Sequence, residues 1–492
     1  MNTTTRDGIF AADQARISAA RKLFLQIYGN EPSGLLRAPA RINILGEHVD
    51  YVSYIPTASI TFANSENDML LLFRPSGNRS VRGASTLGRC GHFQFELSEG
   101  PAAADPAEPI QAWDHYIQSV STPAPHWGNY VKGAVFFALC RFGERIHNGF
   151  DFLVDSRIPA GSGASSSSAL TVLSGAAVRR VNEIEEPPEE LARDSAKAEW
   201  FVGTRGGAMD HITICVADRG QVVHISHGAG TARLLTLPFK SLRWVTFFSH
   251  PAVKGREALL HYNERAAVSR IIIPFILRDR MNHRHGFGEK WRAALQQLES
   301  NPGGVDRELD RLIDELPESM NWSDMERNHH AVYQECARAF PALVKEGAAK
   351  IKVRPRALHH VGEVRRVARA EQLLAGEAHR DQETRPSLGA RLREMGKLLK
   401  ESHLSLRNLY EVSTPEINEL VEVLLWDSNV YGARLMGAGF GGVVLAMVDE
   451  EHVSSLIDRV QREFYQPRQR EAVKENAVMV AAPGVGLTFA RI

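Results

Sequence analysis

A group of polar side chains follows an apolar run close to the N-terminus. Residues 41–51 read Arg-Ile-Asn-Ile-Leu-Gly-Glu-His-Val-Asp-Tyr, which predicts a strand, a glycine break and then Glu47, His48 and Asp50 in close succession. Carboxylates and imidazoles hydrogen-bond to hydroxyl groups, and a site built from them rejects a ligand that leaves them unpaired. Each residue alone would be typical of a solvated loop. The group as a whole indicates a site for a polyol.

A loop of small residues precedes a predicted helix. Residues 159–170 read Pro-Ala-Gly-Ser-Gly-Ala-Ser-Ser-Ser-Ser-Ala-Leu, and the apolar spacing predicts a helix over residues 165–182. N–H groups at a helix N-terminus attract anions, and glycines let phosphate oxygens approach the backbone closely. No Gly-Lys-Ser/Thr follows, so this is not a Walker A loop. We expect a phosphate site here, because a flexible linker is an unlikely connection between a strand and a helix.

A carboxylate follows two glycines further along the chain. Gly206 and Gly207 precede Asp210 and leave room for a ligand beside it. Asp210 is therefore a candidate base for a hydroxyl group or a candidate metal ligand. An aspartate that caps a helix is an equally good interpretation of this segment taken by itself.

A second glycine run lies at residues 437–442 and matches the GxGxxG dinucleotide pattern. That pattern has to follow a strand and begin a helix, whereas here we expect a helix over residues 420–431 before the run and a strand over residues 443–448 after it. We therefore reject a dinucleotide site. A tight turn packed beside the phosphate loop is the functional interpretation.

Neither the cysteines nor the histidines form a recognisable metal pattern. Cys90, Cys140, Cys215 and Cys336 have no CxxC spacing and are interpreted as buried thiols in a reducing compartment. The histidine pairs are 283 and 285, 329 and 330, and 359 and 360. Without an accompanying Cys or carboxylate at ligand spacing, they are interpreted as solvated helical residues.

The length and composition predict a globular protein of two domains. A chain of 492 residues is too long for one core, and 43% hydrophobic with 24% charged residues is typical of globular proteins. Lys plus Arg equals Asp plus Glu at 58 each, so we expect no nucleic acid and no anionic membrane as a partner. No signal peptide or membrane segment is recognised, which predicts a cytoplasmic protein.

The boundary between the domains is expected near residue 238. Strands are predicted at residues 221–226 and 243–248, and a charged, helical stretch follows from residue 266 to about 354. The change from small, glycine-rich sequence to long charged helices therefore divides the chain there.

Together and in this order, the motifs resemble those of the galactokinase branch of the GHMP kinase superfamily. Residues 41–51 are similar to the galactokinase signature, residues 159–170 to the phosphate loop and residues 437–442 to the third motif. Further similar segments lie at residues 127–133, 262–265 and 401–416. The helical stretch at residues 278–353 is longer than is usual in that family.

The resemblance implies an α+β fold. It implies a ribosomal-S5-like N-terminal domain at residues 1–238 and a ferredoxin-like C-terminal domain at residues 239–477, enlarged near residues 278–353. Residues 478–492 are expected to return to the first domain. The implied reaction is ATP-dependent phosphorylation of a hexose at its anomeric hydroxyl, with galactose first, by a monomer or homodimer that uses ATP and Mg²⁺.

The resemblance also implies roles for individual residues. Asp210 would be the catalytic acid/base and Arg41 its cationic partner, while Ser167 and Glu199 would hold Mg²⁺. The residues expected to face the sugar are Glu47, His48, Asp50, Gly207 and Tyr262. Those expected to bind ATP are Gly161, Ser162, Gly163, Ser165, Ser166 and Ser167.

Departures from the family pattern keep the substrate open, among them a segment between Glu199 and Asp210 that is one residue shorter than expected. Residues 52–55 read Val-Ser-Tyr-Ile where the family has a longer Asn-Gly-Gly type turn, and His211 follows Asp210 where the family has Gln. The alternatives are a sugar-1-kinase for N-acetylgalactosamine, another hexose or a pentose, and a non-catalytic sensor of sugar and ATP. Asp210, Arg41 and Ser167 are all present, which favours an enzyme.

Overall fold

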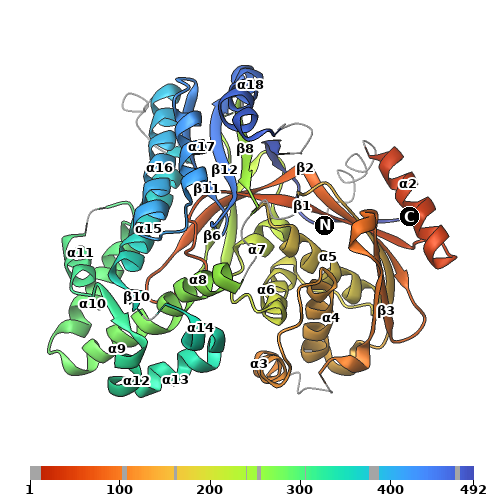
Figure 1. The fold of residues 1–492 in the computed structure, drawn as a ribbon, viewed down its shortest axis with the longest axis horizontal. Coiled ribbons are helices and arrows are strands. Elements are labelled where there is room, and N and C mark those ends of the chain that lie inside the picture. The colour runs from red at the N-terminus through yellow and green to blue at the C-terminus, as the bar shows by residue number, and fades with distance from the viewer. Residues whose placement is uncertain are drawn as a thin grey trace.

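The computed structural model describes residues 13–101, 108–159, 163–239, 241–251, 256–304, 306–348, 350–375, 387–470 and 477–492. Two sheets, each covered by helices, and a separate group of helices make up this part of the chain (Figure 1).

The first sheet is mixed and has β1 and β2 at its centre. Its strand order is β15-β1-β2-β5-β3-β4, and β6 and β14 also pair with β2, while β7 pairs with β6. The strands are β1 (Gly34–Leu45), β2 (Ala58–Pro75), β3 (Ser80–Ser85), β4 (Phe93–Glu96), β5 (Phe150–Ser156), β6 (Gln221–Ser226), β7 (Thr231–Thr236), β14 (Pro483–Gly484) and β15 (Thr488–Arg491). All twelve residues of β1 are buried, because both faces of the sheet are covered.

Helices cover the two faces of this sheet unequally. They are α2 (Gln14–Tyr28) on one face, and α3 (Pro109–Ser119), α4 (Gly128–Phe142), α5 (Ser166–Val181), α6 (Pro188–Ala198) and α7 (Met209–Val216) on the other. Successive side chains of a strand point to opposite faces. Accordingly Leu70 and Leu72 pack against α2, while Leu71 and Phe73 belong to the larger core under α4 and α5.

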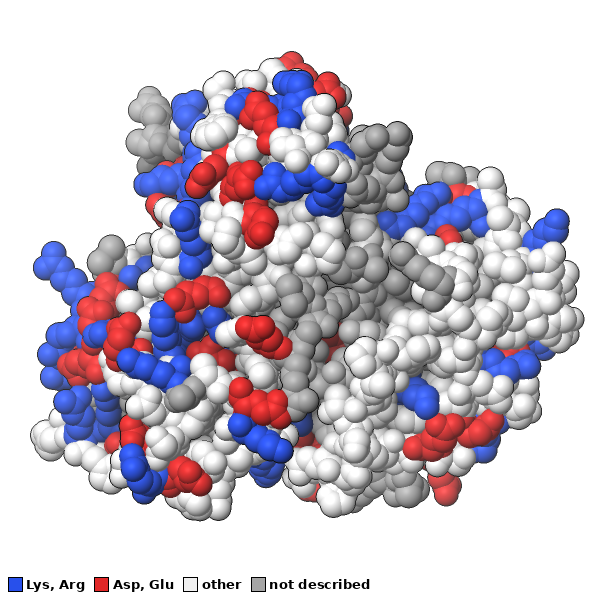
Figure 2. All heavy atoms as spheres, viewed as in Figure 1, with Lys and Arg blue, Asp and Glu red and all other residues white. Residues whose placement is uncertain are grey.

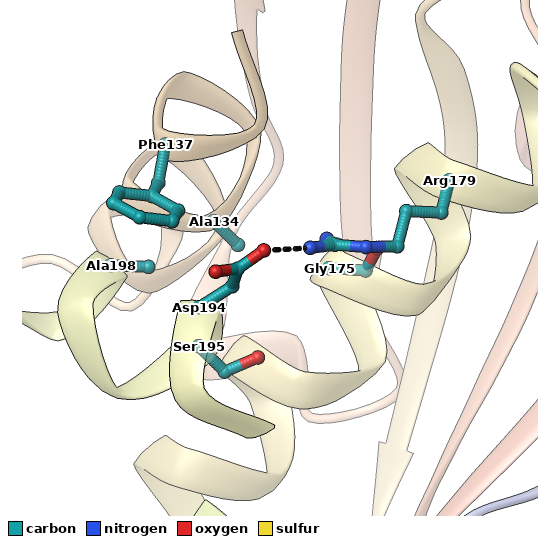
Figure 3. Close-up of a pocket in the computed structure, with 7 residues that line it drawn as sticks. All are labelled: Ala134, Phe137, Gly175, Arg179, Asp194, Ser195 and Ala198. Atoms are coloured by element: carbon teal, nitrogen blue, oxygen red, sulfur yellow. Dashed lines mark hydrogen bonds and ion pairs between the residues drawn. The ribbon is translucent and has the colours of Figure 1, made fainter. Parts of the chain in front are cut away.

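An ion pair lies within the helical layer. Arg179 of α5 donates to Asp194 of α6 next to Gly175, and Phe137 and Ala134 of α4 line the same small space (Figure 3). Burial raises the pKa of Asp194 to about 6, although the charge of Arg179 acts in the opposite direction. The pair links α6 to α5, the helix that follows the phosphate loop.

The second sheet is antiparallel, with strand order β11-β12-β8-β13. Its strands are β8 (Leu242–His250), β11 (Val430–Met436), β12 (Gly442–Asp449) and β13 (Val478–Ala481), and its helices are α16 (Leu388–Asn408), α17 (Pro415–Leu425) and α18 (Val453–Val460). The helix predicted over residues 420–431 was wrong in its second half, because α17 ends at Leu425 and β11 begins at Val430. The glycine run 437–442 therefore joins two antiparallel strands.

The region between β8 and α16, two elements of the second sheet and its helices, forms a helical unit with its own core. It contains α8 (Arg256–Ala267), η5 (Val268–Ile272), α9 (Ile273–His283), α10 (Phe287–Ser300), α11 (Arg307–Asp314), α12 (Trp322–Asn328), α13 (His330–Ala339), α14 (Pro341–Glu346) and α15 (Arg354–Leu374), with the short strands β9 (Ser319–Asn321) and β10 (Lys350–Lys352). Val52, Tyr54 and Ile55 from the N-terminal half pack into this core. The shortened loop is thus a buried connection to the helical unit.

Segment η5 is a π-helix between α8 and α9. Pro274 follows it and has no backbone N–H, so it cannot supply the usual hydrogen bond to the Arg270 carbonyl one turn earlier. This widened turn carries Ser269 and Arg270, both of which contact the site described below.

The remaining short helical turns lie at η1 (Gly88–Cys90), η2 (Leu97–Glu99), η3 (Gly143–Arg145), η4 (Glu199–Val202), η7 (Glu450–His452), the π-helix η8 (Gln461–Tyr465) and η9 (Gln466–Arg468). At the C-terminal end, β13 pairs with β8 of the second sheet and β15 pairs with β1 of the first. The division of the chain at residue 238 stays a prediction.

Charged side chains of both signs alternate over the visible face of the helical unit and around α18, without an extended area of one sign (Figure 2). No helix in the described ranges is long and apolar enough to span a bilayer. Cys140, Cys215 and Cys336 are buried, and Cys90 is partly exposed.

Candidate active site

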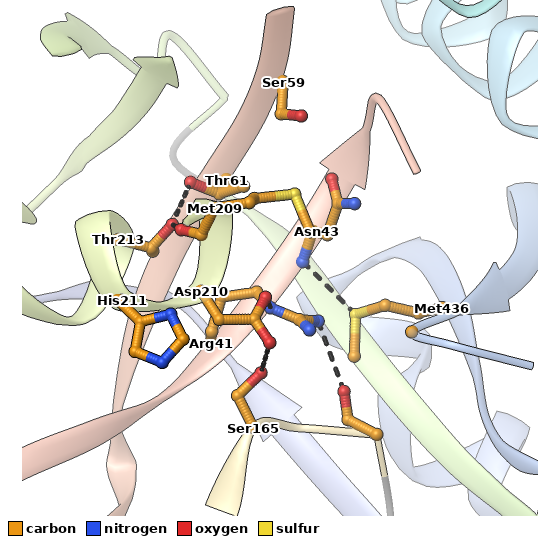
Figure 4. A network of polar contacts seen from close by, with 12 residues as sticks. Arg41, Asn43, Ser59, Thr61, Ser165, Met209, Asp210, His211, Thr213 and Met436 are labelled. Carbon is orange, nitrogen blue, oxygen red and sulfur yellow. Dashed lines mark hydrogen bonds and ion pairs between the residues drawn. The ribbon is translucent and has the colours of Figure 1, made fainter. Parts of the chain in front are cut away.

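Asp210, Arg41 and Ser165 meet in one network of polar contacts (Figure 4). Arg41 comes from β1, Asp210 from the first turn of α7 and Ser165 from the residue before α5. The Arg41 Nε and the Ser165 hydroxyl each donate to one carboxylate oxygen of Asp210, both at 2.5 Å. The Asp210 side chain nevertheless keeps 24% of its exposure, against 4% for Arg41, so a ligand can reach the carboxylate.

The surroundings keep Asp210 ionised. Burial alone would raise its pKa, but the charge and hydrogen bond of Arg41, together with the Ser165 hydroxyl, hold the pKa below its ordinary value. Arg41 in turn donates from Nη1 to the Gly163 carbonyl at 3.2 Å. A carboxylate held in this way can accept a proton from a hydroxyl beside it but has none to give at neutral pH.

Two glycine turns approach each other beside this group. A Cβ added to Gly437 would lie 3.1 Å from the Gly163 carbonyl oxygen, and Gly437 itself has φ +91°. Ser165 adopts a left-handed conformation with φ 65°, which lets the helix α5 begin at Ser166. The predicted nucleotide residues Gly163, Ser165, Ser166 and Ser167 thus surround one helix N-terminus, and Gly161 and Ser162 lie outside the described residues.

The predicted magnesium residues, Ser167 and Glu199, both act on the Tyr130 hydroxyl. The Tyr130 hydroxyl of α4 is hydrogen-bonded to Ser167, and the charge of Glu199 acts on the same hydroxyl. Burial, followed by Glu199, raises the pKa of Tyr130 to about 12. Glu199 also accepts from His211 Nε2 at 3.2 Å. Hydroxyl and carboxylate oxygens fit a hard cation, although no group of three His, Cys, Asp or Glu side chains gathers in the described ranges.

A second carboxylate lies next to the Asp210 helix. Asp50 accepts from the Met209 N–H at 3.4 Å, and a Cβ on Gly207 would lie 2.3 Å from its carboxylate oxygen. Only glycine therefore fits at 207 with Asp50 in this position. Burial, then the charge of Asp210, raises the pKa of Asp50 to about 6.

Aromatic rings form the wall behind Asp50. The His48 ring lies 5.9 Å from the Tyr262 ring, and Tyr51 lies 6.0 Å from it. Burial and then the charge of Asp50 raise the pKa of Tyr262 well above its ordinary range. The structure thus gathers the predicted residues His48, Asp50, Gly207 and Tyr262 next to Asp210.

Glu47 occupies a different place from the other predicted sugar residues. Its Oε2 accepts from the Gly437 N–H at 2.8 Å and from Arg434 Nη2 at 3.1 Å, deep in the protein. Arg434 also donates to the Asn43 carbonyl at 2.7 Å. Glu47 therefore links residues 41–51 to the second glycine turn, residues 437–442.

Some site residues were missed, and one interpretation was wrong. Tyr130 was missed although it lies in residues 127–133, a segment that resembles the family. Arg270 donates to the Gly206 carbonyl at 2.9 Å, but it lies in a charged helical stretch where no motif pointed to a site residue. His359 and His360 were interpreted as solvated, but both are fully buried. They lie on the face of α15 that packs against residues 46–54, a contact that local spacing does not encode.

Family models match three parts of the chain. "GHMP kinases N terminal domain" matches residues 129–218, "GHMP kinases C terminal" matches residues 386–466 and "Galactokinase galactose-binding signature" matches residues 22–55. The chain thus carries matches to both GHMP kinase domains and to the galactokinase signature. The described site combines residues from all three matched parts. Arg41 contacts Asp210 and is influenced by the charge of Glu47, and Glu47 accepts from the Gly437 N–H.

Known galactokinases match over almost the whole chain. The galactokinase of Chloroflexus aurantiacus is 28% identical over 445 residues, 90% of each chain. That of Bos taurus is 26% identical over 456 residues, 91% of this chain and 92% of the relative. The structure of Lactococcus lactis galactokinase complexed with galactose superposes with a TM-score of 0.64 at 22% identity, over 96% of this chain and 99% of the other. The fold is the GHMP kinase fold.

Proposed function

We propose that this protein transfers the γ-phosphate of ATP to the anomeric hydroxyl of galactose, giving galactose 1-phosphate and ADP. The observation that carries the proposal is the position of the ionised Asp210, which Arg41 and Ser165 hold beside the N-terminus of α5 and near Asp50. Its family and its galactokinase relatives support the same reaction.

The proposed reaction uses the chain's own groups in a simple order. The anomeric hydroxyl lies at Asp210 and gives up its proton to that carboxylate as the hydroxyl oxygen bonds to the γ-phosphorus. The bond between the γ-phosphorus and the bridging oxygen breaks, and ADP carries away the electron pair. Arg41 keeps Asp210 ionised and places positive charge next to the transferred group.

The sugar and ATP each have their own proposed binding residues. His48, Asp50, Gly207 and Tyr262 would orient the sugar, with Glu47 fixing the motif to the second glycine turn. The ATP phosphates would be bound by the phosphate-loop residues Gly161, Ser162, Gly163 and Ser165 and by Ser166 and Ser167 at the start of α5. Mg²⁺, held by Ser167 and Glu199, would neutralise phosphate charge there. Location in the cytoplasm and the oligomeric state, monomer or homodimer, stay predictions.

Substitution of the proposed base tests the function. We expect Asp210→Asn to lower kcat by at least about 10³-fold while ATP still binds, because the amide cannot accept the proton. Phosphorus NMR of the products, with a panel of galactose, N-acetylgalactosamine, other hexoses and pentoses, identifies both the sugar and the phosphorylated position.

A matched control is Asp218→Asn, since Asp218 lies on an exposed turn before β6. Turnover by Asp210→Asn equal to that of the control would remove Asp210 from the mechanism. Binding of ATP and sugar without any product from the unmodified protein would favour a sensor instead.

A further inference from the structure

A continuous chain of hydrogen bonds begins at Tyr54 in the shortened loop, passes through His360 of the helical unit and ends at His48. The Tyr54 hydroxyl lies 2.7 Å from His360 Nδ1, and His360 Nε2 lies 3.2 Å from the Tyr410 hydroxyl. Tyr410 and Tyr51 are 3.0 Å apart through their hydroxyls, and the Tyr51 hydroxyl is 2.7 Å from His48 Nδ1. All five side chains are buried. The chain therefore connects the shortened loop, through α15, with a residue of the proposed sugar pocket.

The members of this chain are neutral at physiological pH. Burial lowers the pKa of His48 to about 3 and that of His360 well below its ordinary range. Burial raises the pKa of Tyr410 to about 12 and those of Tyr51 and Tyr54 well above their ordinary value. A neutral imidazole has one N–H donor and one acceptor nitrogen, so the bonds on the two sides of His360 point the same way. The Ser269 hydroxyl donates to the Arg265 carbonyl at 2.7 Å and lies farther from the chain, 3.4 Å from His360 Nε2 and 3.5 Å from the Tyr410 hydroxyl. The shorter contact of Tyr410, 3.0 Å to Tyr51, therefore continues the chain in the direction that His360 sets.

The first residue of the chain sets that direction. In the described part of the protein the Tyr54 hydroxyl has His360 Nδ1 as its hydrogen-bond partner and no second one. If Tyr54 donates, His360 donates from Nε2 to Tyr410, Tyr410 donates to Tyr51 and Tyr51 donates to His48 Nδ1. The opposite direction would leave the Tyr54 O–H buried without an acceptor, which is costly.

The direction of the chain determines the tautomer of its last residue. With Nδ1 accepting from Tyr51, the proton of His48 is on Nε2, and this buried nitrogen has no hydrogen-bond partner within the described residues. The Nε2–H is therefore available to a ligand.

We propose that Tyr54 and His360 are positioning residues that fix His48 as the Nε2–H tautomer, so that His48 donates a hydrogen bond to a hydroxyl oxygen of the sugar. This rests on the proposed function for the identity of the ligand, but the tautomer itself belongs to the free protein. Selectivity for the sugar is then partly determined by a loop and a helix that do not touch it.

The tautomer can be read directly by ¹⁵N NMR of protein labelled at histidine, without sugar or ATP. His48→Gln identifies the His48 signals, and we expect them to show a protonated Nε2 and an unprotonated Nδ1. Tyr54→Phe should move at least about half of the population to the Nδ1–H form, because the first donor is lost. His48 protonated on Nδ1 in the unmodified protein, or unchanged His48 signals in Tyr54→Phe, would overturn the proposal.

Two substitutions of His360 separate positioning from simple loss of packing. In His360→Gln the side-chain amide can still donate to Tyr410, so the Nε2–H form of His48 should be retained. In His360→Leu that donor is absent, and the Nε2–H form should be lost. Equal effects of the two changes would contradict the proposal. Tyr431→Phe is the control, since the Tyr431 hydroxyl donates to Asp449 at 2.8 Å in the second sheet.

Fluorinated sugars test the consequence for the ligand. Fluorine in place of a hydroxyl can accept but cannot donate a hydrogen bond. At the carbon whose hydroxyl accepts the hydrogen bond from His48, the fluoro analogue of galactose should bind more tightly than the deoxy analogue. Tyr54→Phe should remove this difference and raise the KM for galactose about threefold to tenfold with little change in kcat. A normal tautomer in NMR with no fluoro preference at any position would place the failure in the proposed ligand.

Discussion

At the scale of single residues, two neighbouring carboxylates have pKa values displaced in opposite directions. Arg41 overcomes burial and lowers the pKa of Asp210, whereas burial and the nearby Asp210 charge raise the pKa of Asp50 to about 6. Arg270 moderates the Asp50 shift but does not contact its carboxylate by a hydrogen bond in the described structure. Such displacement separates a proton acceptor from a residue that binds hydroxyls.

The Asp50 shift predicts a pH dependence of sugar binding. We expect the KM for the sugar to rise as the pH falls through about 6, because a protonated Asp50 accepts fewer hydrogen bonds from hydroxyl groups. The KM for ATP should stay constant over the same interval. Initial rates between pH 5 and 8 measure both, and Asp50→Asn should have a weaker but pH-independent sugar affinity in this window.

Stability gives an independent check on Asp50. Its folded-state pKa lies above the unfolded value, so the ionised group destabilises the fold at pH above about 6, and this effect disappears toward pH 4. Asp50→Asn should therefore raise the thermal midpoint at pH 8 more than at pH 4.5. An equal change at both values would show that Asp50 titrates normally.

At the scale of elements, the N-terminus of α5 depends on its neighbours. Ser167 lies in the first turn of this helix and is hydrogen-bonded to Tyr130 of α4, while Glu199 begins η4 after α6. The Arg179–Asp194 pair joins α5 to α6, the helix that precedes Glu199. The elements thus position oxygen ligands that are far apart in sequence.

Ser167→Ala tests this arrangement. We expect kcat to fall about tenfold to a hundredfold at low Mg²⁺ and to recover partly as Mg²⁺ is raised, since one oxygen ligand is missing. Activity measured against Mg²⁺ concentration at fixed ATP gives the result. The control Ser174→Ala removes a hydroxyl that bonds only within α5, to the Leu170 carbonyl at 2.7 Å. A Mg²⁺ dependence identical to that of the control would exclude Ser167 as a ligand.

At the scale of the whole molecule, the helical unit is joined to the first sheet through α15. Glu363 of α15 is fully buried and accepts from the Gly46 N–H at 2.9 Å, and Arg366 pairs with its other oxygen at 2.7 Å. His359 on the same face approaches the Glu47 carbonyl at 3.1 Å. Burial would raise the pKa of Glu363, but the charge of Arg366 and its neighbours lowers it to about 2.

Glu363→Gln should therefore destabilise the whole protein. We expect a loss of about 3 kcal/mol in the free energy of unfolding at pH 7, because a buried charge loses its partner. Since the pKa of Glu363 is depressed, its contribution is present above the unfolded pKa and is lost as the pH falls toward 2. The difference from the unmodified protein should thus be smaller at pH 3.5 than at pH 7.

Denaturant or thermal unfolding at the two pH values measures the effect of Glu363→Gln. Glu335→Gln is the matched control, since Glu335 is exposed on α13. A destabilisation no greater than that of the control would show that α15 is not held to the first sheet through this carboxylate.

Local sequence was sufficient for most elements and for the chemistry of the motifs. The helix predicted over residues 165–182 is α5 (Ser166–Val181), and the strand predicted over residues 221–226 is β6. The periodicity of apolar residues and the positions of glycines involve only neighbouring residues, so the sequence alone predicts them. The helix predicted over residues 420–431 failed beyond Leu425, because an apolar run at Val430–Met436 is compatible with either a helix or a strand until the strand pairs with β12.

By itself, then, the sequence determined a phosphate-binding helix N-terminus, a polar motif after a strand and the family to which both are similar. The tertiary structure alone decided that Glu47 bonds to Gly437, that Tyr54 meets His360 and that Arg270 reaches Gly206. These partners come from distant parts of the chain. Their meeting depends on how whole elements pack against each other, and no local pattern of residues records that packing.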